Sequence, residues 1–85
     1  MRLCEEIEAR LNEAFAPELL IVEDDSESHR GHGGWREGGE THFNVKIRAA
    51  AFGPMSRLQR HRAVHSALGA DLVGRIHALA LDIDA

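Results

Sequence analysis

The sequence predicts an α+β domain with the element order αββααβ, in which helices cover a three-stranded sheet. Three observations favour this class. Apolar residues recur at every fourth position near the N-terminus, they alternate with polar residues in mid-chain, and a glycine-rich segment separates two strand-like runs. The chain has 85 residues, 44% of them hydrophobic, which is typical of one globular domain. We therefore expect residues 1–85 to form a single domain.

The first element is an amphipathic helix over residues 2–15. Its apolar stripe consists of Leu3, Ile7 and Leu11. Pro17 cannot continue the helix, because its ring fixes φ and it lacks the N–H donor. The apolar run at residues 19–22 is therefore expected to be the first strand.

A glycine-rich segment and a second strand follow. Residues 24–40 contain five of the eight glycines, so we expect a poorly ordered surface loop over residues 25–39. In residues 41–48, apolar and polar residues alternate, which predicts a strand with one buried face, antiparallel to the first. The alternation places Phe43, Val45 and Ile47 in the core and His42 on the outer face.

The remaining elements are helical and then extended. Residues 56–72 have helical spacing, but Leu58 and Val64 are six positions apart, about 240° around a helix, so they do not share one face. A kink or two short helices are predicted. Residues 75–84 read as the last strand, in which His77 shares the inward face with Leu79 and Leu81 and stands at the rim of the core.

Composition also limits the function. The formal net charge is -4, but residues 46–75 carry six basic residues against Asp71 alone. We expect a protein without a membrane segment, and the single cysteine, Cys4, fits the cytoplasm. No nucleophile motif or phosphate-binding glycine motif occurs, so we do not expect an enzyme.

The six histidines are the main candidates for metal ligands in this sequence. His29 and His32 lie in the glycine-rich segment, where they are either solvated or ligands. His77 reads either as a core histidine or as a ligand. A zinc module using these three residues stays open. His61 and His65 are one helical turn apart, a spacing that can bind zinc.

Basic residues gather at the start of the second helical region. They are Arg57, Arg60, His61 and Arg62. Such a group could contact nucleic-acid phosphates. A solvated helix face or a protein-docking surface fits the same residues.

Three segments resemble the BolA family in order and spacing, over residues 3–83. They are SHRGHGGWREGGETHF, LQRHRAVHSAL and IHALAL. The resemblance implies a fold similar to the class II KH domain. It also implies pairing with a monothiol glutaredoxin and a [2Fe-2S] cluster shared with that partner and glutathione. The implied ligands on this chain are His77 and either His32, which we prefer, or His29.

The resemblance implies a role in iron–sulfur cluster trafficking or in iron or redox regulation. It also implies an alternative, because some family members are DNA-binding transcriptional regulators; here the contacts would come from Arg57, Arg60, His61 and Arg62. Alone, the protein is expected to be a monomer or a weak homodimer.

Overall fold

The computed structural model describes residues 2–24 and 42–85. In these ranges the elements are α1 (Leu3–Phe15), β1 (Leu19–Asp24), β2 (His42–Arg48), the 3-10 helix η2 (Ala50–Phe52), α2 (Arg57–Leu68), α3 (Ala70–Val73) and β3 (Ala78–Asp84). The order αββααβ and the α+β class are confirmed. The expected disorder of residues 25–39 concerns residues outside the described ranges.

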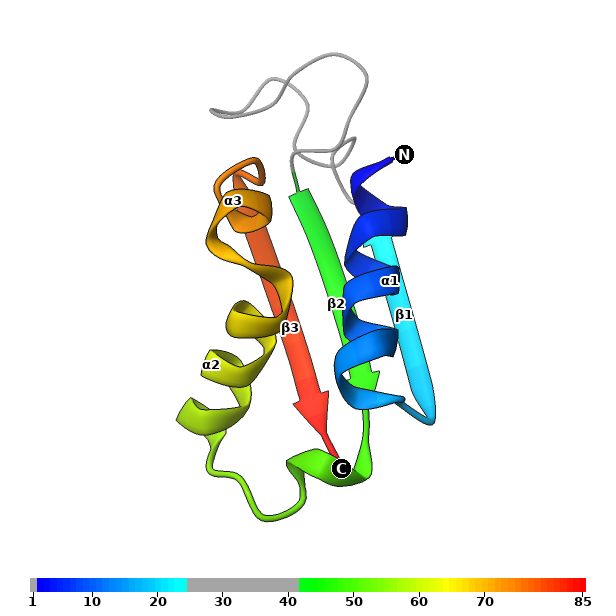
Figure 1. The fold of residues 1–85 in the computed structure, drawn as a ribbon, viewed down its shortest axis with the longest axis vertical. Coiled ribbons are helices and arrows are strands. Elements are labelled where there is room, and N and C mark those ends of the chain that lie inside the picture. Colours follow the sequence, from blue (N-terminus) through cyan, green and yellow to red (C-terminus); the bar gives the residue numbers. More distant parts are fainter. Residues whose placement is uncertain (1, 25–41) are drawn as a thin grey trace.

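The sheet has the strand order β1-β2-β3. As predicted, β1 runs antiparallel to β2, and Leu19 pairs with Arg48. Strand β3 runs parallel to β2, with Ala78 opposite His42. The end of β1 and the starts of β2 and β3 therefore lie at one end of the sheet, while α1 and α2 cover one of its faces (Figure 1). We call this end the loop end, because the segment between β1 and β2 is attached there.

The core lies between the helices and the sheet. Phe43, Val45 and Ile47 are buried as predicted, and Leu79 and Leu81 are half-buried and pack against them. The other buried apolar residues are Leu3, Ile7, Leu11, Ala49, Phe52, Val64, Leu68 and Leu72. Burial of every fourth residue in α1 follows from the stripe read in the sequence.

The predicted break in the second helical region is confirmed at Gly69, which separates α2 from α3. Its φ of 87° and ψ of 147° lie in a region open almost only to glycine. We expect Gly69→Ala to lower the free energy of unfolding by about 1–3 kcal/mol, because alanine is strained there. Gly53→Ala is the control, since Gly53 has right-handed helical angles. Urea unfolding of both variants measures the difference, and equal losses would contradict this explanation.

The predicted start of the last strand at residue 75 is wrong. The chain is still turning there, because the N–H of Arg75 donates to the Leu72 carbonyl and that of Ile76 to the Val73 carbonyl. Strand β3 begins only at Ala78. Across the two described ranges, no helix is long and apolar enough to cross a membrane.

Candidate functional site

His77 lies between the turn after α3 and the first residue of β3, at the loop end of the sheet. The sequence predicted a ring at the rim of the core. Instead, the side chain is exposed, because the residue precedes the strand and is not held on its inward face. The exposed imidazole is accessible to an ion or a partner.

The ring of His42 lies beside that of His77. The ring centroids are 5.1 Å apart and the ring planes are tilted by 59°. Although alternation placed His42 on the outer face, it is buried, with 6% of its surface exposed. Sequence reasoning missed this pair, since only the parallel register of His42 with Ala78 brings it next to His77.

The two loop histidines, His29 and His32, lie outside the described residues. Their segment joins Asp24 to His42, and both of these residues lie at the loop end. Within residues 2–24 and 42–85, no group of three or more His, Cys, Asp and Glu side chains is arranged to hold a metal. The described part of the chain therefore offers a pair of imidazoles and no larger ligand set.

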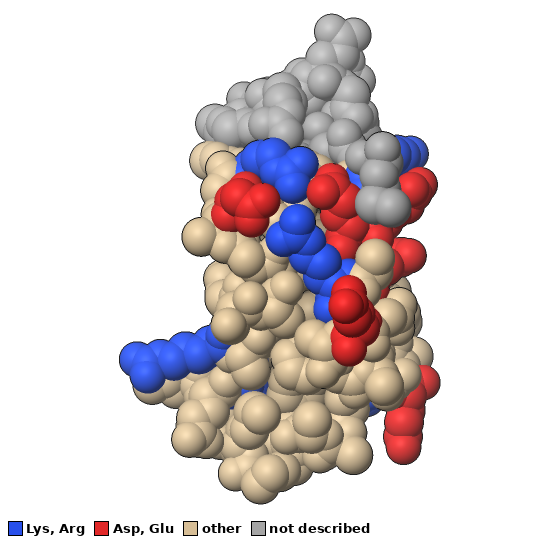
Figure 2. Space-filling view, in the orientation of Figure 1, with Lys and Arg blue, Asp and Glu red and all other residues tan. Residues whose placement is uncertain are grey.

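Charges on the helix-bearing face are mixed. Basic and acidic side chains lie among one another in the half nearest the loop end, and much of the remaining surface is uncharged (Figure 2). Two ion pairs that reach α1 illustrate this mixing. Arg75 pairs with Glu6 at 3.1 Å, and Arg10 pairs with Asp71 at 3.6 Å. Such a face does not form one continuous basic surface.

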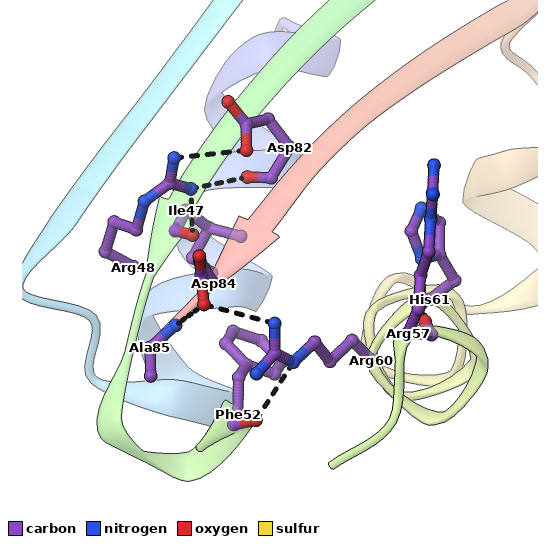
Figure 3. Close-up of polar contacts among 9 residues, drawn as sticks. All are labelled: Ile47, Arg48, Phe52, Arg57, Arg60, His61, Asp82, Asp84 and Ala85. Carbon is purple, nitrogen blue, oxygen red and sulfur yellow. Dashed lines mark hydrogen bonds and ion pairs between the residues drawn. The ribbon is translucent and has the colours of Figure 1, made fainter. Parts of the chain in front are cut away.

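Arg60 is held by structural contacts (Figure 3). Its Nε donates to the Phe52 carbonyl at 3.0 Å, and its Nη1 lies 3.1 Å from the Asp84 carboxylate. The pKa of Asp84 lies below its ordinary value of 3.8, because the Ala85 N–H donates to the carboxylate and the Arg60 guanidinium lies beside it. At a pH above the ordinary pKa of 3.8, ionised Asp84 therefore adds to the free energy of unfolding. This stabilisation is lost as pH falls through the lowered pKa. Arg60 thus joins α2 to the chain end and to η2.

The other predicted basic residues are placed differently. Arg57 and Arg62 are exposed, and His61 is half-buried. The Nδ1–H of His61 donates to the Arg57 carbonyl at 2.9 Å. In Figure 3, Arg57 and His61 point away from the Arg60 contacts. The predicted group of four is therefore divided into three surface residues and one structural residue.

Arg60→Gln is expected to lower the melting temperature more than Arg57→Gln. The first substitution removes the ion pair with Asp84 and the Nε hydrogen bond to Phe52, whereas Arg57 makes no ion pair within the described residues. Differential scanning calorimetry of both variants measures the effect. Equal decreases in melting temperature in the two variants would show that the Arg60 contacts add nothing measurable to stability.

Comparison with known proteins places these features in a family. Residues 11–85 match the family model for BolA-like proteins. The sequence is 44% identical over 75 residues to BolA-like protein 1 of Mus musculus, covering 88% of this chain and 52% of the mouse protein. The chain thus spans about half the length of that relative.

Two further matches are also to BolA proteins. The sequence is 34% identical over 77 residues to the DNA-binding transcriptional regulator BolA of Haemophilus influenzae, covering 91% of this chain and 71% of that protein. The fold is similar to that of BolA1 from Arabidopsis thaliana, with a TM-score of 0.83 at 31% identity, covering 99% of this chain and 92% of that one. The chain belongs to the BolA-like protein family.

Proposed function

We propose that this protein pairs with a monothiol glutaredoxin and binds a [2Fe-2S] cluster jointly with it and with glutathione. The observation that carries the proposal is the position of His77. Its imidazole is exposed, and the residue directly precedes Ala78 at the loop end, where residues 25–41, which include His29 and His32, connect β1 to β2. Imidazole nitrogen is an established ligand of [2Fe-2S] iron.

The ligand count requires a partner. A [2Fe-2S] cluster normally has four protein ligands, most often thiolates. This chain has one cysteine, Cys4, and its described residues contain no group of three or more potential ligands. A glutaredoxin cysteine and the glutathione thiol would complete the set. With His77 and a loop histidine on this side, one iron would carry imidazoles, which raises the reduction potential of such clusters.

The biological role that follows is cluster trafficking or iron and redox regulation in the cytoplasm. An imidazole ligand is more weakly bound than a thiolate and can be protonated, so the cluster is suited to transfer. The compartment is inferred from the single cysteine, which fits a reducing environment.

The test is anaerobic reconstitution of this protein with a monothiol glutaredoxin, iron, sulfide and glutathione. The expected result is an absorption spectrum that differs from that of glutaredoxin reconstituted alone, with iron eluting in a complex of the two chains on size exclusion. The proposal fails if all the iron elutes with glutaredoxin and the spectrum is unchanged.

The second ligand is assigned by comparing His32→Ala with His29→Ala. We expect His32→Ala to lose the spectrum of the mixed complex and His29→Ala to keep it, because His32 is flanked by Gly31 and Gly33. Retention of the spectrum in a variant that carries both substitutions would exclude a loop histidine as the second ligand.

A second candidate function is DNA binding. It is favoured by the Haemophilus influenzae relative, which is named a DNA-binding transcriptional regulator, and by the exposed Arg57 and Arg62. If DNA is a ligand, replacing both residues by Gln should abolish salt-sensitive retention of duplex DNA without lowering thermal stability. Arg60 is left unchanged, since its contacts are structural. Absence of salt-sensitive binding by the unaltered protein would remove this candidate.

A further inference from the structure

We propose that the imidazoles of His42 and His77 together bind one divalent transition-metal ion, such as Zn²⁺, on this chain alone. The proposal goes beyond the function above, because it needs neither glutaredoxin nor glutathione and uses His42, which the sequence placed on the outer face. It rests on the distance between the two rings, on their fixed backbone and on a hollow beside His42.

The distance between the two ring centroids equals the distance expected for two imidazoles that coordinate the same metal ion. With a metal–nitrogen distance of about 2.0 Å and about 1.1 Å more to each ring centre, tetrahedral coordination places the two centres about 5 Å apart. The observed distance between the ring centroids is 5.1 Å. The 59° tilt excludes parallel stacking of the two rings, in which neither nitrogen edge would face a common point.

Both residues are attached to ordered backbone. His42 is the first residue of β2 and pairs with Ala78 across the sheet. His77 is fixed between Ala78 and a turn closed by the hydrogen bond from the Ile76 N–H to the Val73 carbonyl. Metal binding therefore requires little further ordering of the main chain, so it loses little conformational entropy there. The buried ring of His42 is restrained further by its surroundings.

The site is also accessible. His77 is exposed, and a hollow of about 270 Å³ opens beside His42, lined by His42, Phe43, Asn44, Ala78, Leu79 and Ala80. The small side chains of Ala78 and Ala80 leave room for water molecules. Zinc in proteins is usually four-coordinate, so two protein ligands would leave two positions for water.

Nitrogen ligands determine the class of ion. Imidazole suits Zn²⁺, Cu²⁺ and Ni²⁺, whereas Mg²⁺ and Ca²⁺ prefer oxygen ligands. We therefore expect binding of Zn²⁺ and no response to Mg²⁺. Two ligands, rather than four, make this an exchangeable site and not a structural one.

Other groups on this chain could also bind Zn²⁺ and must be tested separately. His61 and His65 are one turn apart on α2, and Cys4 offers a thiol. Three control variants address these groups and the loop: His61→Ala with His65→Ala, His29→Ala with His32→Ala, and Cys4→Ser. The proposal predicts that each of the three keeps the affinity of the unaltered protein.

The experiment is isothermal titration calorimetry of the isolated protein with Zn²⁺. We expect one ion per chain, with the affinity reduced about 10-fold or more in His77→Gln. That variant should fold normally, because His77 is exposed. His42→Gln should have the same effect, and circular dichroism checks its fold, since His42 is buried.

Two results would overturn the proposal. One is unchanged Zn²⁺ affinity in His77→Gln, which would leave the ring pair as an ordinary tilted aromatic contact, since such contacts have the same separation. The other is loss of the site in any of the three control variants. The titration contains no glutaredoxin or iron, so its outcome is independent of whether the mixed cluster forms.

Discussion

Leu68→Ala is expected to lower the free energy of unfolding by about 3 kcal/mol, since it removes buried methyl groups and leaves a cavity. Leu68 is fully buried at the end of α2, in the core that also contains Val64 and Leu72. Small domains have total stabilities of about 5–15 kcal/mol, so the loss is a large fraction of the whole. Urea unfolding followed by circular dichroism measures it.

Leu58→Ala provides the matched control, because it removes the same atoms from the same helix. The side chain of Leu58 is 59% exposed, so its removal should change the free energy of unfolding by less than about 0.5 kcal/mol. Comparable losses in the two variants would contradict the packing of α2 described here.

His77→Ala is expected to eliminate the spectrum that is specific to the mixed complex with glutaredoxin. The substitution removes a proposed ligand at the loop end of the sheet. Because the side chain is exposed, the isolated protein should keep its melting temperature. Anaerobic reconstitution of the variant with glutaredoxin and glutathione, followed by absorption spectroscopy, measures the loss.

His61→Ala is the control for this prediction. His61 lies on α2 and contacts the Arg57 carbonyl, away from the loop end, so this variant should keep the spectrum of the mixed complex. Retention of that spectrum in His77→Ala would overturn the ligand assignment.

The sequence predicted the elements well, because each depends on a local pattern. The four-residue spacing in α1 and the alternation in β2 reflect burial of one face, which the structure confirms at Ile7 and Phe43. The division of the second helical region was also expected, but the reason for it was wrong. Leu58 and Val64 lie on one unbroken helix, α2, where Leu58 is exposed and Val64 is buried, and the break comes later, at Gly69. The start of β3 was not predictable, because the turn at residues 74–76 depends on hydrogen bonds to α3.

The candidate site was less predictable, because it depends on contacts between distant segments. The parallel pairing of β2 with β3 brings His42 beside His77, and nothing in the alternation around residue 42 indicates this neighbour. Arg60 was grouped with Arg57 by sequence proximity. Its contacts with Phe52 and with the end of β3 arise only when the helix packs against the sheet edge.

The central claim is that an imidazole of this chain ligates the iron of a shared cluster. Electron–nuclear double resonance of the reduced mixed complex, with ¹⁵N-histidine in this protein only, tests it most directly. Because a ligating nitrogen couples magnetically to the reduced cluster, we predict a ¹⁵N signal that disappears in His77→Ala. A reduced mixed cluster without ¹⁵N coupling would contradict the account, since all of its ligands would then come from the partner and glutathione.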